Sequence, residues 1–299
     1  MKVLMPFTTS WKEEGILHLE HLNLRMPEHG PIKQMYYDTL GFGIDSRRAQ
    51  NIAKGSGTLW ANIGTSQIHM PTGEVQVVPG STGLIYRDLE EVKARLRKAE
   101  GATTLKDTKF GWQEDVDKTI VVTGPHGNVF RLHQMPTGED KDNRGMPVVD
   151  PRGGHLPSAP SLGVGLAYIH FRCRRGTVGG IARFYRKVFN AEVEVLELGG
   201  AGGAGGASVR GIHALVRAGP VQHLGFQELG EGEGMPEEYD GHHICVYLTR
   251  ECFCSSFMEL ERMGLIFVNP IRNYGKADTL EKALDEHQYR IKNIVRGRP

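Results

Sequence analysis

Two stretches of sequence decide the fold: MYYDTLGF at residues 35–42 and RFYRKVFN at residues 183–190. Each places a tyrosine in a short apolar helix, and these tyrosines, Tyr37 and Tyr185, are 148 residues apart. Further along, Gly64-Thr-Ser-Gln67 is answered by Gly219-Pro-Val-Gln222. A repeat of this length has the size of a domain rather than of a solenoid unit, so the chain is predicted to hold two similar domains.

Each half divides again into two units with one order of elements: a strand, a helix and about three further strands. Residues 18–26 (HLEHLNLRM) alternate apolar and polar side chains, as a half-buried strand should. Residues 88–99 (DLEEVKARLRKA) form a clear amphipathic helix that begins at Asp88. The last unit opens with a strand at 239–248, continues with a helix at 252–264 and a strand at 287–295, and is one strand short.

The pattern predicts an α+β protein with two tandem domains. The boundaries are 16–136 for the first domain, 137–161 for a linker rich in proline, glycine and charge, and 162–299 for the second. In each domain we expect the two βαβββ units to pair and curl into a cupped, partly open barrel with flanking helices. The glycine run at 199–207, which only the second half contains, is interpreted as a hairpin insertion and not as a dinucleotide site, because a strand follows it.

Composition bounds the function. The 299 residues carry 36 basic and 35 acidic side chains, and a net charge of +1 provides no field for nucleic acid or an anionic membrane. The sequence has no apolar run of membrane-spanning length and no secretory signal at its start. Four cysteines without a Cys-x-x-Cys pair favour a reducing compartment, so a cytoplasmic protein is expected.

The order of these motifs resembles the vicinal oxygen chelate superfamily, which contains glyoxalases, extradiol dioxygenases and bleomycin-resistance proteins. The resemblance covers about residues 17–295 and is carried by strings such as SQIHMPTGE, GPHGNVFRL and YDGHHICVYL. It implies that metal ligands come from the first and last strands of the units and point into the cup. A divalent ion held there (Fe, Mn, Zn or Ni) would polarise two adjacent substrate oxygens.

In the first domain, the resemblance places His21 and His69 at the ligand positions of the first unit. The matching positions of the second unit hold Ser81 and Arg131. Because a fixed positive charge opposes metal binding, Arg131 favours an alternative, a pocket that binds an anionic or carboxylate substrate. Histidine pairs are also common as hydrogen-bonded structural groups.

In the second domain, His170, His243 and Glu228 form the better candidate set, with Glu228 as an anionic ligand or catalytic base. Register is the weak point, because the 148-residue offset places Ile169 rather than His170 opposite His21. A slip of one residue reverses the face of a strand. Two histidines and one carboxylate favour iron or manganese and dioxygenase-like chemistry, whereas zinc or nickel with a carboxylate base favours isomerisation.

Two functions are therefore carried forward. The first is a metal-dependent enzyme acting on a small oxygenated molecule, either dioxygenase-like or glyoxalase-like. The second is a non-catalytic small-molecule-binding or scaffold protein that kept the cups and lost the chemistry. The expected partners are a small molecule and, through an unpaired strand edge, a second copy of the chain as a homodimer, with no nucleic acid and no membrane.

Overall fold

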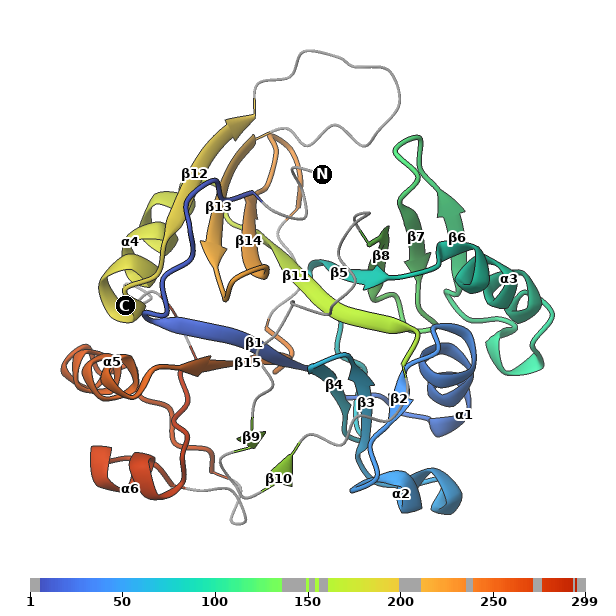
Figure 1. Ribbon diagram of the computed structural model, residues 1–299, viewed down its shortest axis with the longest axis horizontal. Coiled ribbons are helices and arrows are strands. Elements are labelled where there is room, and N and C mark those ends of the chain that lie inside the picture. Colours follow the sequence, from blue (N-terminus) through green and yellow to red (C-terminus); the bar gives the residue numbers. More distant parts are fainter. Residues whose placement is uncertain are drawn as a thin grey trace.

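Four units of strand, helix and further strands follow one another along the chain in the computed structural model (Figure 1). The structure describes residues 6–135, 149–150, 154–155, 161–198, 211–234, 239–270, 276–292 and 294. Most of the predicted linker and the glycine run at 199–207 lie outside these residues.

The elements of each unit are as follows. The first unit contains β1 (Ile16–Asn23), α1 (His29–Ile32), η1 (Lys33–Thr39), β2 (Gly43–Ile44), α2 (Ala49–Lys54), β3 (Leu59–Ile63) and β4 (Ser66–Met70). The second contains β5 (Gly80–Tyr86), α3 (Leu89–Ala99), η2 (Thr103–Leu105), β6 (Gly111–Glu114), β7 (Ile120–Thr123) and β8 (Val129–Gln134). A short pair, β9 (Val149–Asp150) and β10 (Gly154–His155), follows. The third contains β11 (Gly163–Cys173), α4 (Val178–Phe189), β12 (Val193–Leu198), β13 (Gly211–Arg217) and β14 (His223–Glu228), and the fourth contains β15 (His243–Leu248), α5 (Arg250–Arg262) and α6 (Leu280–Asp285).

The local signals explain where these elements begin and end. The Asp88 carboxylate accepts hydrogen bonds from the backbone N–H groups of Glu90 (2.8 Å) and Glu91 (3.3 Å), which caps α3 as its sequence predicts. The first helix is π-helical over η1, and it stops at Gly41, whose φ of +68° lies in the left-handed region that favours glycine. Helix α4 buries the predicted apolar face, including Tyr185 and Val188.

The strand order confirms the α+β fold of paired units and changes the partners. The eight-stranded sheet has the order β12-β13-β14-β11-β5-β8-β7-β6, so it joins the second and third units through the antiparallel pair β5 and β11. The five-stranded sheet has the order β15-β1-β4-β3-β2 and joins the first and fourth units through β1 and β15. The first and second units, and the third and fourth, were expected to share a sheet within each domain, and that pairing is wrong.

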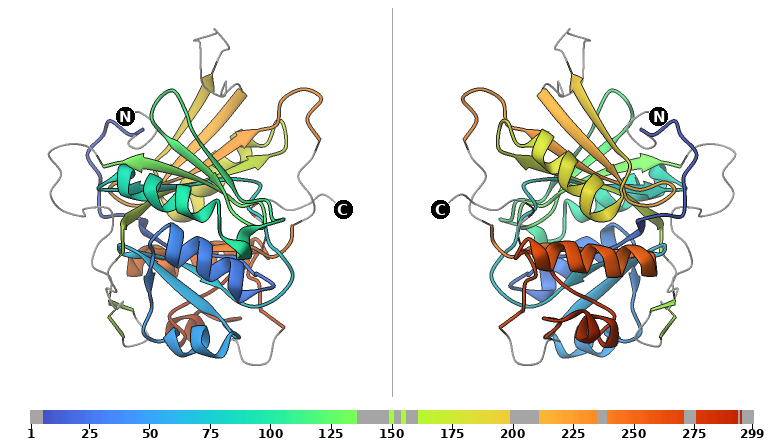
Figure 2. Two further views of the ribbon diagram at one scale, coloured as in Figure 1. Left: turned by 90° about the vertical axis from the view of Figure 1, so that its right-hand side faces the viewer. Right: turned by 90° about the vertical axis from the view of Figure 1, so that its left-hand side faces the viewer.

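Neighbouring units in the chain instead meet through their helices. Figure 2 shows α3 lying along the helix of the first unit on one side of the molecule, and α4 along α5 on the other. One set of buried apolar side chains runs through all four units, from Ile16 to Leu265. The two sheets therefore enclose a common core. The domain boundaries at residues 136 and 162 remain predictions from the sequence.

The fourth unit is short, as predicted, but its end differs from the prediction. Among the described residues after β15, the sole β contact is an isolated bridge between Ile266 and Ile291. The predicted strand at 287–295 is therefore wrong over its described residues, since it starts with His287 in a left-handed conformation (φ 51°). Helix α6 was not predicted. As a result β15 stands at the edge of its sheet.

The four cysteines form no disulfide with one another. Within the described ranges, every helix is too short or too polar to cross a membrane.

Candidate metal centre

The sheet pairing sorts the six predicted site residues into two groups. His21 on β1, His69 on β4 and His243 on β15 lie on the five-stranded sheet. Arg131 on β8, His170 on β11 and Glu228 on β14 lie on the eight-stranded sheet. His243 was assigned to the second domain, yet its ring faces His21 of the first. We call His21, His69 and His243 the first imidazole cluster.

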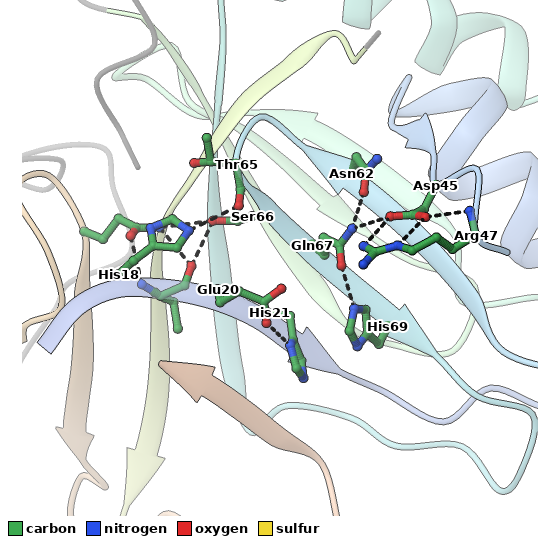
Figure 3. Close-up of polar contacts among 12 residues, drawn as sticks. His18, Glu20, His21, Asp45, Arg47, Asn62, Thr65, Ser66, Gln67 and His69 are labelled. Carbon is green, nitrogen blue, oxygen red and sulfur yellow. Dashed lines mark hydrogen bonds and ion pairs between the residues drawn. The ribbon is translucent and has the colours of Figure 1, made fainter. Parts of the chain in front are cut away.

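The three rings of the first cluster are close together. The rings of His21 and His69 stack with centroids 4.0 Å apart, and the His243 ring faces His21 edge-on at 6.1 Å. Figure 3 shows the first two side chains at neighbouring strands, with His18 lying apart from them beside Thr65. The Nε2 atom of His18 is 3.2 Å from the Thr65 carbonyl oxygen, which gives this buried histidine a structural role.

A β-bulge brings a carboxylate to His21. Leu19 pairs with Val246 and His21 pairs with Cys245 across the ladder, so Glu20 is an extra residue on β1. A bulge breaks the alternation of faces, and here it turns the buried Glu20 side chain onto its neighbour. The Nδ1 atom of His21 donates a hydrogen bond to the Glu20 carboxylate (Figure 3). This contact leaves the Nε2 lone pair of His21 for a ligand-binding role.

A chain of hydrogen-bonded side chains orients His69 through its Nε2 atom, whereas His21 is held through Nδ1. The Nε2 atom of Gln67 donates to the Asp45 carboxylate at 2.7 Å, which fixes the orientation of the amide. The Gln67 carbonyl oxygen therefore accepts from Nε2 of His69 at 2.7 Å. Burial raises the pKa of Asp45, but hydrogen bonds from Arg47 outweigh burial and hold the pKa below its usual value.

Aromatic stacking fixes the plane of the His69 ring. Trp60 stacks on its outer face with centroids 4.4 Å apart and an interplanar angle of 14°. The guanidinium groups of Arg47 and Arg48 lie over Trp60, 4.7 and 4.3 Å from its centroid. His69 thus sits between Trp60 and His21 with little freedom to rotate.

His243 approaches the pair from β15 as a neutral ring. Burial, together with His21 and Arg290, lowers its pKa to about 4. Its Nδ1 atom is 3.3 Å from the Gly241 carbonyl oxygen, which accepts a hydrogen bond and leaves Nε2 of His243 without the proton.

The donor atoms suit a divalent metal ion. One ligand atom from each of Glu20, His21 and His69 lies within 4.8 Å of the other two. Metal-binding histidines usually donate their second ring N–H to a carboxylate or carbonyl oxygen, and His21 and His69 both show this arrangement. Neutral imidazole is a ligand for zinc, copper, iron and nickel. The residues present therefore fit a metal ion.

The second imidazole cluster, His133, His170 and His223 with Tyr168, lies on the eight-stranded sheet and is internally paired. The Nε2 atoms of His170 and His223 are 2.9 Å apart, so these two rings hydrogen-bond with each other. The Nε2 atom of His133 is 2.8 Å from the Tyr168 hydroxyl. Burial lowers the pKa of His170 to about 3 and lowers that of His223 as well. These nitrogens stabilise the sheet among themselves.

Two glycines make room for this packing. A Cβ on Gly225 would lie 2.3 Å from the His170 ring, and a Cβ on Gly83 would lie 2.3 Å from the Tyr168 ring. Both rings therefore lie flat across a neighbouring strand. The close fit leaves His170 in contact with protein atoms.

Two other predicted site residues have structural partners. The Arg131 guanidinium donates to the Asp115 carboxylate at 2.9 Å, which neutralises the charge that was expected to bind an anion. The Glu228 carboxylate accepts from the backbone N–H of Val178 at 2.9 Å, so it caps the start of α4. Along β14, Glu228 alternates with Gln227 and faces away from His223, since residues of odd separation point to opposite faces. The structure does not bring Glu228 to His170 or His243.

Glu20 and Gln67 are site residues that sequence reasoning missed. Leu19, Leu22 and Leu24 depart from strict alternation, and that spacing signals the bulge at Glu20. Gln67 belongs to a repeated tetrapeptide whose second copy ends in Gln222. The Gln222 amide accepts from Leu19 N and donates to the Leu166 carbonyl oxygen, which joins β1 to β11. The two copies have thus diverged, one toward the candidate site and one toward the junction of the sheets.

Comparisons with known proteins place the chain beside several solved structures. No protein-family model matches the chain, and no curated protein sequence does. Glyoxalase I from Zea mays is similar at 12% identity and a TM-score of 0.49, over 86% of this chain and 85% of that chain. The 2,3-dioxygenase LapB from Pseudomonas sp. KL28 is similar at 15% identity and a TM-score of 0.33, over 89% and 86% of the two chains.

A shorter match is the fosfomycin resistance protein FosX from Mesorhizobium loti, at 12% identity and a TM-score of 0.29 over 40% of this chain and 92% of that chain. Glyoxalases and dioxygenases are among the proteins that the sequence motifs resemble.

Proposed function

We propose that the chain is a metal-dependent enzyme that binds a small oxygenated molecule through two neighbouring oxygen atoms. One observation carries this proposal: one ligand atom from each of Glu20, His21 and His69 lies within 4.8 Å of the other two, and each histidine has a hydrogen-bond acceptor at one ring nitrogen. A histidine that serves only packing has no need of a fixed tautomer. A metal ligand does, because its outer hydrogen bond sets the direction of its lone pair.

His21, His69 and His243 are the proposed ligands, and Glu20 is the group that orients His21. In the Glu20 carboxylate, the Oε2 atom accepts the hydrogen bond from His21 Nδ1 and the Oε1 atom does not. When bound, a divalent ion (Fe, Mn, Zn or Ni) supplies a Lewis acid that stabilises negative charge on the substrate oxygens. The His243 ring, whose pKa is lowered to about 4, adds no positive charge at neutral pH that would oppose the ion.

The reaction class proposed first is dioxygenase-like, with an isomerase-like reaction second. Neutral imidazole is a ligand that iron accepts, and extradiol dioxygenases are among the proteins that the sequence motifs resemble. An isomerase needs a carboxylate base beside the metal, and Glu20, the carboxylate of this group, is occupied by His21. His243 lines a cavity of about 860 Å³, which gives a substrate access to this ring.

Metal analysis of the purified protein tests the proposal. We expect about one equivalent of Fe, Mn, Zn or Ni per chain by mass spectrometry, and a rise in melting temperature when the bound metal is restored to chelated protein. His243→Ala is expected to lose the metal while circular dichroism stays unchanged. A protein that is folded, metal-free and unaffected by any of the four ions would instead support the non-catalytic binding protein.

A further inference from the structure

The two copies of the repeated tetrapeptide meet at one segment of β1, just before the candidate metal centre. The first copy, residues 64–67, joins β3 to β4, and the second, residues 219–222, joins β13 to β14. From the first copy, the Ser66 hydroxyl donates to the Leu19 carbonyl oxygen at 2.9 Å. From the second, the Gln222 side chain bonds with both backbone groups of Leu19. Residues from both halves of the chain therefore hold one short segment of β1.

The Gln222 side chain is buried, and both ends of its amide have partners. Its Oε1 atom accepts from the backbone N–H of Leu19 at 2.9 Å, and its Nε2 atom donates to the Leu19 carbonyl oxygen at 3.2 Å. The Nε2 atom also donates to the carbonyl oxygen of Leu166 on β11 at 2.8 Å. Because a backbone N–H is a donor only, the Leu19 N–H fixes which end of the amide faces it. One amide thus ties β1 to the eight-stranded sheet.

At Leu19 this amide takes the place of a neighbouring strand. The ladder between β1 and β4 contains His21, Leu22 and Asn23, so it begins two residues after Leu19. In an antiparallel strand the N–H and C=O groups of one residue point to the same side. Both groups of Leu19 bond with Gln222, and they therefore point away from β15. Removal of the amide would take away a partner from a buried backbone N–H, which costs free energy.

The β-bulge of β1 lies between Leu19 and His21 and makes Glu20 the inserted residue. The backbone of Leu19 is held by Gln222 on one side of the bulge, and His21 enters the ladder with β4 on the other. Between these two fixed neighbours, the Glu20 carboxylate accepts from Nδ1 of His21 (Figure 3). A bulge directs a side chain in a defined way only where its position on the strand is fixed. The Gln222 contact therefore helps to set the direction of the Glu20 carboxylate.

The turn that carries Gln222 is itself well held. The Ala218 N–H donates to the Gln222 carbonyl oxygen at 2.9 Å, and the Arg217 guanidinium donates to the Gly219 carbonyl oxygen at 3.3 Å. Gly219 has a φ of +128°, and a Cβ at this position would lie 2.8 Å from the Leu17 carbonyl oxygen. Glycine thus lets the turn approach β1 closely. The Gln222 amide reaches β1 from a fixed backbone.

We propose that Gln222 is a positioning residue of the candidate metal centre. Its amide fixes the backbone of Leu19, the bulge then directs the Glu20 carboxylate, and the carboxylate orients the His21 ring for metal binding. This inference rests on the proposed function, because it adds a residue from the other sheet to the same site. It makes metal binding on the five-stranded sheet depend on a turn of the eight-stranded sheet.

Proton nuclear magnetic resonance of the metal-free protein tests the orienting contact directly. A ring N–H that donates to a buried carboxylate is shielded from water and gives a downfield signal. The His21 signal is identified as the one that His21→Asn lacks. Gln222→Met keeps the length of the side chain and removes its hydrogen bonds. We expect the His21 signal to shift or disappear in this variant, and the signal of His69, which Gln67 holds, to stay unchanged.

Titration with Zn²⁺ measures the consequence for the metal centre. The affinity of Gln222→Met is expected to be about three- to tenfold lower than that of the wild type. This loss is smaller than the roughly 10–100-fold of a partner that touches the ligand itself, because Gln222 acts through Glu20. Circular dichroism checks that the variant is folded.

Tyr86→Phe is the matched control for the loss of a buried hydrogen bond between the eight-stranded sheet and the first unit. The Tyr86 hydroxyl donates to the Leu40 carbonyl oxygen at 3.0 Å, at the end of the first helix and not on β1. The variant is expected to lower stability while the His21 signal and the Zn²⁺ affinity stay as in the wild type. Ser66→Ala removes one bond to the Leu19 carbonyl oxygen and is expected to move the His21 signal in the same direction by less.

A folded Gln222→Met protein with an unchanged His21 signal would overturn the inference. An equal loss of that signal in Tyr86→Phe would do so as well, because any lost buried hydrogen bond would then disturb the site. If Gln222→Met does not fold, Ser66→Ala decides, and an unchanged signal there counts against Gln222. Failure of the proposed function looks different: the wild type would then bind no Zn²⁺, while the response of the His21 signal to Gln222→Met stands.

Discussion

The two sheets carry imidazole clusters that resemble each other in residue type and differ in hydrogen bonding. In the first cluster, Glu20 and Gln67 each accept a hydrogen bond from one ring nitrogen of His21 and His69. In the second cluster, the Nε2 atoms of His170 and His223 hydrogen-bond with each other. A cluster that binds a ligand therefore differs from a structural one by the acceptors around it.

The surroundings of the two clusters also differ, in how open they are to a small molecule. In the first, His243 lines a cavity at the edge of a sheet, since β15 has a partner on one side only among the described strands. The second lies in the middle of eight strands. There Gly83 and Gly225 have no side chain, so the rings of Tyr168 and His170 can lie against the backbone of the neighbouring strands. Access for a small molecule and outer hydrogen-bond acceptors coincide in the first cluster.

The largest expected effect is the contrast between two single histidine replacements. His69→Ala is expected to weaken metal binding by more than about a hundredfold, because a lost ligand costs more than the roughly 10–100-fold of a lost outer partner. His170→Ala is expected to leave the affinity unchanged. Titration against a chelating indicator measures both. The reverse outcome, metal lost in His170→Ala alone, would move the site to the eight-stranded sheet.

A smaller effect separates two buried carboxylates. Glu20→Gln is expected to weaken metal binding by about 10–100-fold, since the amide no longer holds the proton of His21 as a charged acceptor. Glu228→Gln is its matched control, because it lies at the start of α4 and is expected to lower stability by about 1 kcal/mol with the metal affinity unchanged. If Glu228→Gln impairs metal binding and Glu20→Gln does not, the assignment of the two carboxylates is wrong.

The packing of the second cluster predicts a stability effect. Gly225→Ala is expected to lower the free energy of unfolding of the metal-free protein by about 1–3 kcal/mol, because the new Cβ meets the His170 ring. Gly111→Ala on β6 is the control, since nothing lies within 4 Å of its Cβ position. Urea unfolding measures both. Equal stability of the two variants would show that His170 has room to move.

The smallest expected effect, taken per pH unit, is a dependence of the free energy of unfolding on pH. The pKa of His170 is about 3 in the folded protein and about 6.5 in the unfolded chain, so the unfolded chain binds more protons between these values. Stability of the metal-free protein is therefore full above about pH 6.5 and falls as the pH drops toward 3, by up to about 1.4 kcal/mol per pH unit for each such histidine.

His170→Asn tests which histidines cause this slope. The variant is expected to show a shallower loss of stability than the wild type between pH 6.5 and 4, measured by urea unfolding at each pH. Part of the slope is expected to remain, because His243, with a folded pKa of about 4, titrates in the same direction. An unchanged slope would mean that His170 takes up its proton without cost in the folded state.

The sequence predicted the elements well where local periodicity defines them. The four units, the Asp88 cap and the apolar faces of α3 and α4 are readable from side-chain spacing, because helices and strands bury residues with different periods. The secondary structure after α5 could not be predicted from side-chain spacing. There a single bridge at Ile291 replaces a predicted strand, since its apolar residues pack on the core without a ladder.

The individual histidines of the candidate site were predicted from the sequence, but they were grouped differently from the way the structure groups them. His21, His69 and His243 were named from their positions in strands, but His243 was grouped with His170 and Glu228. The register of β11 also needed the structure: His170 joins the second cluster, and Ile169, which the repeat offset placed opposite His21, is fully buried in the core. A shift of one residue decides between these faces, and no local pattern specifies it.

The sequence by itself determined that this protein is built from four related strand and helix units, with candidate histidines on strands of the first, third and fourth units. Hydrophobic periodicity is a local property, and it survives in the order of residues. Only the tertiary structure decided that the first unit pairs with the fourth and the second with the third. Sheet edges are matched across long separations by packing and twist, so the histidines that meet were not those nearest in the chain.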